Sequence, residues 1–288
     1  MAGNFILVES GATKSDWCLV NKDGAVYRRL VRPGMNVSTM SMQEITRIIS
    51  ETFSTESLSD RGFKGFYMYT AGVITPEIRS RIDSLIREIS DIPDVDIQND
   101  LMGAARSVCG HGSGIAAILG TGSNVCFYDG QFTLCKVRSG GFILGDEGSA
   151  ATLGKLFLSD YLKGLVPAPV CADFEKEFDA SYSAIVEGVY RSHSPSGYLG
   201  SIAPFITRHR DDPYIAKLIA DNFRSFAKRL LSHYDCAGYP VGIVGGFGWA
   251  CREMLLPILE EEGIHVGKII KAPADGLVQY HLEERGEK

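Results

Sequence analysis

Two short loops contain residues that could bind phosphate, and each loop lies between two strand-like segments. The first reads Ser10-Gly11-Ala12-Thr13-Lys14 and the second reads Gly120-Thr121-Gly122-Ser123. Glycine lets backbone N–H groups approach phosphate oxygens because no Cβ stands in the way, and threonine adds a hydroxyl donor. A Walker A loop reads G-x-x-x-x-G-K-[ST] and joins a strand to a helix, so neither loop is of that kind. One such loop is weak evidence for phosphate binding, whereas a pair predicts that a polyphosphate is held from two sides.

The segments around the first loop have the pattern of three consecutive strands. Residues 5–8 form an apolar run, 16–20 follow the loop, and 25–31 follow an Asp23-Gly24 hairpin signal. The second loop has the same surroundings, with strands predicted at 115–119, 125–128 and 132–137 and the hairpin signal at Asp129-Gly130. Two copies of the same arrangement predict a duplicated domain.

Helical spacing and further strands fill the rest of the chain. Ser41 to Glu44 has the capping-box spacing that begins a helix, and Thr75-Pro76 begins another. The remaining predictions are strands at 65–69, 95–97 and 241–244, a loop at 245–248, and helices at 213–231, at 251–261 with a bend or break near Pro257, and after 273–276.

Composition excludes several classes of protein. The chain has 288 residues, 45% hydrophobic and 22% charged, which favours two globular domains. Its net charge of -6 gives no reason to expect nucleic acid or an anionic membrane as a partner. The seven cysteines are odd in number and contain no C-x-x-C pair, so neither a disulfide framework nor a zinc site is indicated. No apolar run reaches the length of a membrane span, and we expect a cytoplasmic protein.

The motifs taken together resemble the N-acetylglucosamine kinase and BadF/BadG/BcrA/BcrD ATPase family of the actin/hexokinase/heat-shock-chaperone superfamily. The matching segments, in family order, are residues 9–14, 99–100, 120–124, 145–149 and 245–246. The resemblance implies an α/β fold of two ribonuclease-H-like (actin-like ATPase) domains with a nucleotide cleft between them. It places the first domain at residues 1–107, completed by a C-terminal helix at 272–288, and the second at 108–271.

The resemblance also implies the roles of individual residues in nucleotide binding and catalysis. ATP would be the nucleotide, and Asp100 would be the general base that takes the proton of the attacking hydroxyl. Glu9 would hold Mg²⁺ through a water molecule. Aspartate is commoner at this position in the family, although eukaryotic N-acetylglucosamine kinases carry glutamate. The nucleotide-binding residues would be Gly11, Ala12, Thr13, Lys14, Gly120, Thr121, Gly122, Gly245 and Gly246.

A sugar is the substrate that the resemblance implies, and its contacts would come from Asn36, Thr121, Asn124, Asp146 and Glu147. Amide and carboxylate groups suit a polyhydroxylated ligand because each can bond adjacent hydroxyls. The segment 140–144 is shorter than in much of the family and has Phe142 where a tryptophan is common.

Each of these residues also has a plainer interpretation. Asp100 could cap a helix that begins at Leu101, and Asn36 could serve only the turn in Pro-Gly-Met-Asn. Lys14 could lie on the surface, and Asp146 with Glu147 could form a solvated turn. Ser149 is interpreted as a helix N-cap rather than a ligand.

The resemblance implies an ATP-dependent kinase that phosphorylates an amino sugar. N-acetylglucosamine, converted to its 6-phosphate, is the favoured substrate among the amino sugars. Two alternatives stay open: an ATPase activator of a 2-hydroxyacyl-CoA dehydratase, which would carry an iron–sulfur cluster on cysteines, and a non-catalytic sugar sensor. The expected partner is a small-molecule sugar, and a homodimer is left open.

Overall fold

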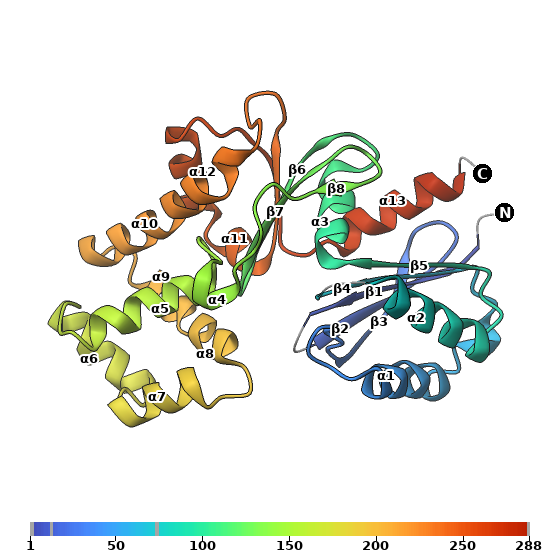
Figure 1. Ribbon diagram of the computed structural model, residues 1–288, viewed down its shortest axis with the longest axis horizontal. Coiled ribbons are helices and arrows are strands. Elements are labelled where there is room, and N and C mark those ends of the chain that lie inside the picture. The colour runs from blue at the N-terminus through green and yellow to red at the C-terminus, as the bar shows by residue number, and fades with distance from the viewer. Residues whose placement is uncertain (1–2, 12–13, 73–74, 287–288) are drawn as a thin grey trace. The chain divides into compact units, whose positions relative to one another are not determined.

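The computed structural model describes residues 3–11, 14–72 and 75–286 of the chain. The chain divides into two compact units (Figure 1). Unit 1 comprises residues 1–111 and 273–288, and unit 2 comprises residues 112–272.

Unit 1 is a five-stranded sheet with helices on both faces. Its elements are β1 (Phe5–Ser10), β2 (Lys14–Val20), β3 (Val26–Pro33), α1 (Met42–Thr55), η1 (Ser59–Arg61), β4 (Gly65–Thr70), α2 (Pro76–Ile89), β5 (Asp94–Asn99), α3 (Asp100–Cys109) and α13 (Ala274–Gly286). The strand order is β3-β2-β1-β4-β5. The first three strands are antiparallel neighbours, whereas β1, β4 and β5 run parallel to one another.

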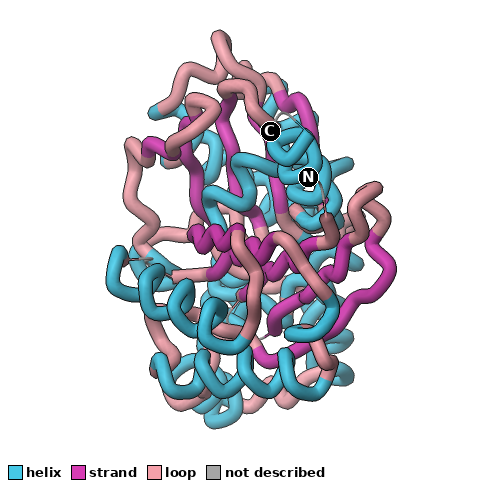
Figure 2. Tube along the Cα trace, turned by 90° about the vertical axis from the view of Figure 1, so that its right-hand side faces the viewer, coloured by secondary structure: helices cyan, strands magenta, loops and turns pink. Residues whose placement is uncertain are grey.

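Side chains alternate along the strands of unit 1, so successive residues pack against the helices on opposite faces of the sheet. Ile6 and Val8 point to the face whose core includes Ile45 of α1 and Ile82 of α2. Phe5 points to the other face, where its ring packs edge-on against Tyr67 and lies 6.3 Å from the ring of His281 on α13. Figure 1 shows α1 and α2 on one side of this sheet and α3 and α13 on the other, and Figure 2 shows the same strands between helices.

Unit 2 has more helix around a second five-stranded sheet. Its strands are β6 (Gly114–Leu119), β7 (Ser123–Tyr128), β8 (Thr133–Leu134), β9 (Val241–Val244) and β10 (Val266–Ile270). Its helices are α4 (Gly141–Leu144), α5 (Ala150–Tyr161), α6 (Ala168–Glu177), α7 (Tyr182–Tyr190), α8 (Pro195–Ser201), α9 (Ala203–Arg208), α10 (Pro213–Arg229), η2 (Leu231–His233), α11 (Gly246–Ala250) and α12 (Arg252–Glu261).

The two sheets have the same topology, which confirms the predicted duplication. The order in unit 2 is β10-β9-β6-β7-β8. With β6 in the place of β1, this is the order of unit 1 strand for strand, and the parallel and antiparallel neighbours also correspond. The loop at Gly120–Gly122 therefore occupies in unit 2 the place that the loop after Ser10 occupies in unit 1.

Most predicted elements are present, and three predictions were wrong in detail. The strand expected at 132–137 is reduced to Thr133–Leu134. The loop expected at 245–248 is helical from Gly246 onward, because α11 begins directly after Gly245. Pro257 neither ends nor interrupts α12; it lies inside the helix, and the interruption comes earlier, at Cys251 between α11 and α12.

Capping explains where two helices of unit 1 begin. Ser41 and Glu44 form the predicted capping box at the start of α1, and Thr75 caps α2 with Pro76 at its first position. Within the described ranges, no helix combines the length and apolar character needed to cross a membrane.

Candidate active site

Three parallel strands of unit 1 end together at one edge of the sheet. Thr70, the last residue of β4, is the register partner of Ser10 on β1 and of Asn99 on β5. In open α/β sheets, ligands bind outside the carboxyl ends of the parallel strands. The residues predicted for chemistry in unit 1 lie at or directly after these ends.

Asp100 is the first residue of α3 and immediately follows β5. The N-cap of α3 is Asn99, whose Oδ1 accepts a hydrogen bond from the Met102 N–H at 2.8 Å. The plainer interpretation of Asp100 as a cap for a helix beginning at Leu101 is therefore wrong, because α3 begins at Asp100 and Asn99 is its N-cap. The Asp100 residue is exposed, so its carboxylate is accessible to a substrate.

The surroundings of Asp100 favour its protonated form. Desolvation by nearby protein atoms raises the pKa of Asp100 to about 6, although the N–H groups of Leu101 and of Asp100 itself oppose the shift by hydrogen bonding. Solvent still reaches the residue, so the carboxylate stays ionised at neutral pH and is a stronger base than an ordinary aspartate. This is the property expected of a general base.

Glu9 lies near the end of β1 at this edge, and one of its carboxylate oxygens is buried. Oε1 of Glu9 accepts no hydrogen bond from any residue that the structure describes. Asp16 lies opposite Glu9 in the β1–β2 register, so the two carboxylates share one face of the sheet. Burial raises the pKa of Glu9 to about 8, with Asp16 adding to the shift and Arg29 opposing it.

This arrangement fits a divalent cation held together with phosphates. A buried carboxylate oxygen with no donor, next to a second carboxylate, is a hard oxygen ligand that Mg²⁺ prefers. Among the described residues no group of three His, Cys, Asp or Glu side chains forms a metal cage. Mg²⁺ is commonly bound by one or two carboxylates plus substrate phosphates and water, so a complete protein cage is not required.

The first phosphate loop is described only in part. Ala12 and Thr13 lie outside the described residues. Gly11 is in place, and its N–H donates to the Lys14 carbonyl at 3.0 Å. The Lys14 side chain is 66% exposed and pairs with Asp16 at 2.8 Å. Lys14 therefore lies on the surface, as its plainer interpretation had it, and is paired there with Asp16.

Asn36 lies in a loop that is fastened to the ends of β1 and β4. The Met35 N–H donates to Ser10 Oγ at 2.7 Å, and the Val37 N–H donates to the Ala71 carbonyl at 3.1 Å. Asn36 Oδ1 accepts from the Ser38 N–H at 2.9 Å, which is the turn chemistry given above as its plainer interpretation. The same contacts hold Asn36 at the sheet edge that carries Asp100.

In unit 2 the second phosphate loop is a tight turn fixed to a helix. The Gly120 N–H donates to the Gly122 carbonyl at 3.0 Å. The first two N–H groups of α5, those of Ala150 and Ala151, donate to the carbonyls of Gly120 and Thr121 at 3.0 and 3.1 Å. Thr121 remains exposed at the tip. The turn is therefore rigid and its threonine is available to a ligand.

Gly245 brings the end of β9 against the same turn. Its φ is +141°, and a Cβ at this position would lie 2.4 Å from the Leu119 carbonyl oxygen and 3.1 Å from the Gly120 nitrogen. Only glycine fits there. Gly246 begins α11, and a Cβ on it would meet open space. The two glycine segments predicted to bind nucleotide in this unit are thus neighbours on β6 and β9.

Asp146 is buried beside the Gly120–Gly122 turn. The residue is 9% exposed, and its Oδ1 accepts from the Ser123 N–H and the Ser139 hydroxyl, both at 3.3 Å. A Cβ on Gly122 would lie 2.9 Å from Asp146 Oδ2, so glycine is needed for this contact. The backbone has φ 56°, which aspartate tolerates better than most residues. A solvated turn is therefore the wrong description, and burial raises the pKa of Asp146.

The remaining predicted residues of unit 2 have local partners. Glu147 pairs with Arg229 at 3.2 Å, and its carbonyl accepts from the Ser123 hydroxyl at 2.8 Å. Asn124 Oδ1 accepts from the Val125 N–H at 2.9 Å. Ser149 is the N-cap of α5, as predicted, with its hydroxyl accepting from the Thr152 N–H at 3.1 Å.

Sequence reasoning missed the two serines that hold Asp146. Ser123 could have been found from its position directly after the glycine turn, where its N–H must point into the loop. Ser139 lies in a segment without periodicity, and only the fold brings it to Asp146.

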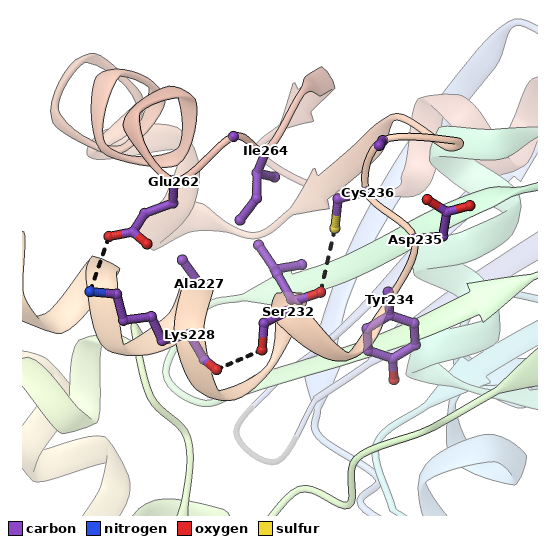
Figure 3. A pocket seen from close by; sticks show the side chains of 11 residues that line it. Ala227, Lys228, Ser232, Tyr234, Asp235, Cys236, Glu262 and Ile264 are labelled. Carbon is purple, nitrogen blue, oxygen red and sulfur yellow. Dashed lines mark hydrogen bonds and ion pairs between the residues drawn. The ribbon is translucent and has the colours of Figure 1, made fainter.

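Two cavities have linings that include none of these residues. One, of about 280 Å³, is bordered by α10, η2 and residues 262–264 in unit 2 (Figure 3). Its charged groups are used internally, since Lys228 pairs with Glu262 at 3.4 Å. The other, of about 310 Å³, lies between α1 and the end of β3 in unit 1. Neither is lined by a residue predicted to bind nucleotide or sugar.

Two sheets of identical strand order, each with a glycine turn or loop between its first two strands, which are antiparallel, define the class of two-domain ribonuclease-H-like kinases and ATPases. No family model matches the chain. A solved structure described as the "Putative N-acetylglucosamine Kinase" from Porphyromonas gingivalis is 34% identical, covers 98% of this chain and 99% of its own, and has a TM-score of 0.90. The chain therefore belongs to the N-acetylglucosamine kinase family.

Two further relatives are more distant. An N-acetylmuramic acid/N-acetylglucosamine kinase of Clostridium acetobutylicum is 27% identical over 157 residues, and the match spans 51% of this chain but only about half, 49%, of that curated relative. A second solved structure with the same description, from Chromobacterium violaceum, is 20% identical over 96% of this chain and 98% of its own, with a TM-score of 0.73. The latter supports the fold alone.

Proposed function

We propose that this chain is an ATP-dependent kinase that transfers the γ-phosphoryl group of ATP to a hydroxyl of an amino sugar, N-acetylglucosamine first, giving the 6-phosphate. The observation that carries the proposal is Asp100: an exposed carboxylate with a raised pKa, released from capping by Asn99, at the carboxyl edge of three parallel strands. Membership of the N-acetylglucosamine kinase family supports the choice of substrate.

The chemistry needs few reacting groups on the protein. The sugar oxygen forms a bond to the γ-phosphorus, the bond from that phosphorus to the β–γ bridging oxygen breaks, and ADP leaves with its electron pair. Asp100 accepts the proton of the attacking hydroxyl. Exposure of its carboxylate and a pKa near 6 let Asp100 take that proton at neutral pH.

The other proposed roles concern binding and orientation. The turn at Gly120–Gly122 presents backbone N–H groups and the Thr121 hydroxyl to phosphate, Gly245 allows β9 to pack against that turn, and Gly246, where a Cβ would meet open space, leaves room for the nucleoside. Asn36 and Asp146 orient the sugar, with Asn124 and Glu147 at its margin. Mg²⁺, when bound, neutralises phosphate charge, and Glu9 would hold it with Asp16 nearby. We place the reaction in the cytoplasm, where ATP is supplied.

A coupled ADP-release assay over N-acetylglucosamine, glucosamine, N-acetylmannosamine and N-acetylmuramic acid tests the proposal. We expect turnover with N-acetylglucosamine and a decline of kcat below a pH of about 6, as Asp100 becomes protonated. Asp100→Asn should keep nucleotide affinity and lose at least about a hundredfold in kcat, because it removes the base. Near wild-type kcat in this variant would remove Asp100 from its role. Sugar binding without ADP release in the wild type would favour the sensor.

A further inference from the structure

Tyr69 lies on the sheet of unit 1 between the two acidic residues of the proposed site. It is the register partner of Glu9 on β1 and of Gln98 on β5, two residues before Asp100. Adjacent strands are about 4.8 Å apart, so β1 and β5 are separated by about 10 Å and β4 fills the interval. Tyr69 is 3% exposed and faces α3 and α13. Sequence reasoning gave it no role beyond membership of a strand.

Tyr69 contacts α3 at two positions about one helical turn apart. Its ring lies against Gly103, where a Cβ would come within 2.9 Å of the Tyr69 Cδ1 atom. Gly103 is one helical turn after Asp100 and shares its side of α3. One turn further on, Arg106 Nη1 donates to the Tyr69 hydroxyl at 2.8 Å and to Asp96 at 2.6 Å. The position of α3 on the sheet is therefore set at Tyr69.

The same hydroxyl reaches α13. Tyr69 Oη and His281 Nε2 are 2.9 Å apart. Because Arg106 already donates to this oxygen, the hydroxyl proton is free to be donated to Nε2, which leaves the His281 proton on Nδ1, 3.4 Å from Glu284. Desolvation raises the pKa of Tyr69 and lowers that of His281, so a neutral hydroxyl and a neutral imidazole are both favoured. One oxygen thus joins β4, α3 and α13.

We propose that Tyr69 is a positioning residue of the reaction: through its hydroxyl and its ring it holds α3, and with it the Asp100 carboxylate, in place relative to Glu9, and it makes α13 part of that support. The inference rests on the proposed function for its catalytic consequence. It assigns Tyr69 no contact with substrate.

The test compares Tyr69→Phe with Tyr67→Phe in the full chain. Tyr67 is the matched control, since it is a buried tyrosine on the same face of β4, its ring stacks on His281 at 3.6 Å, and its hydroxyl donates to Asp94 at 2.6 Å. No hydrogen bond from the Tyr67 hydroxyl to α3 is present among the described residues. Both variants keep the ring and lose one hydroxyl.

We expect Tyr69→Phe to lower kcat about tenfold or more while the KM values for ATP and sugar change less than about twofold, because a misplaced base slows the chemical step without weakening ground-state binding. Tyr67→Phe should keep kcat within about twofold of wild type. Equal kcat losses in the two variants would overturn the inference, because that is what a general loss of packing produces.

Hydrogen exchange provides a readout that does not depend on activity. Tyr69→Phe should speed exchange of the amides in residues 101–106 by about tenfold relative to Tyr67→Phe, with the strands unchanged. Unchanged exchange in α3 would refute the positioning role even if kcat fell. If the wild type phosphorylates no sugar, the proposed function fails, and the exchange comparison still decides whether Tyr69 fixes α3.

Discussion

Asp100 and Glu9 both have a raised pKa, but their surroundings give them different tasks. Asp100 is exposed and has no acidic neighbour among the causes of its shift, so it can exchange a proton with a substrate. Glu9 has a buried oxygen that accepts no hydrogen bond from the described residues, and it faces Asp16, so a divalent cation would relieve the repulsion between the two carboxylates. Burial raises the pKa of both residues; at the scale of single residues, solvent exposure and the neighbouring carboxylate distinguish the proposed base from the proposed metal ligand.

Glu9→Gln should change the pH dependence of stability in the protein free of metal and nucleotide. The pKa of Glu9 is about 8 in the fold against 4.5 for an ordinary glutamate. The protonated form of Glu9 stabilises wild type fully at a pH below the pKa of the unfolded state, and this stabilisation is lost as pH rises through about 8. Glutamine cannot titrate, so the Tm of the variant relative to that of wild type should rise between pH 4.5 and 8. The rise should be about 2–4 °C for each 1 kcal/mol of unfolding free energy that wild type loses.

Thermal unfolding by circular dichroism at pH 4, 6 and 8.5 measures this difference. A constant offset between the two proteins at all three values would show that Glu9 does not titrate in the fold as proposed. Adding Mg²⁺ with a non-hydrolysable ATP analogue should then raise the Tm of wild type more than that of the variant, because only wild type offers the carboxylate.

At the scale of single elements, the close approach of α3 to β4 depends on one glycine. Gly103→Ala adds a Cβ that would meet three atoms of Tyr69 at 2.9–3.1 Å, and Tyr69 is held by two hydrogen bonds. The helix must therefore move by a few tenths of an ångström, and Asp100 moves with it. We expect kcat to fall about three- to tenfold with little change in the KM for ATP.

Gly286→Ala is the control for this change. Gly286 is also helical, at the end of α13, and a Cβ there meets no atom within 4 Å. Alanine is favoured over glycine by about 1 kcal/mol in a helix interior and by less at a helix end, so Gly286→Ala controls for the type of substitution and not for the full propensity gain at Gly103. Loss of kcat in Gly286→Ala as large as in Gly103→Ala would contradict the role of the Gly103 contact.

Elements with a local signal were predictable from the sequence, and contacts between distant segments were not. Asp-Gly turns, the Ser41 capping box and the apolar runs gave β1 to β3, α1 and the repeat in unit 2. The strand after Asp129-Gly130 was predicted too long, because Phe132 is 69% exposed and packs against no core. Tyr69 and Ser139 act through residues remote in the chain, and no spacing within their own segments reports such contacts.

At the scale of the whole molecule, a helix that follows unit 2 in the chain completes unit 1. Five residues of α13 are buried, and Gly276 approaches the Ser107 carbonyl so closely that a Cβ would lie 2.3 Å from its oxygen. A chain truncated after residue 272 should therefore uncover the part of this sheet face that α13 covers, while α3 remains. We expect it to lose protection of β1, β4 and β5 in hydrogen exchange.

The strands of unit 2 provide the internal control in the same experiment. They contain none of the deleted residues, so β6, β7 and β9 should stay protected as in the full chain. Retained protection in both sheets would show that α13 is dispensable for the fold of unit 1.

The return of the chain to its first sheet also has a consequence for biosynthesis. Residues 3–111 are translated before unit 2, yet α13, which packs on Tyr67 and Tyr69 through His281, is translated only after all of unit 2. Unit 1 cannot complete its fold until α13 is made, and until then part of its aromatic surface is accessible to chaperones, whereas unit 2 can fold as soon as it is translated. The order of synthesis and the order of folding are thus opposed in this chain, and a translational stall near codon 272 would release a product in which unit 1 lacks α13.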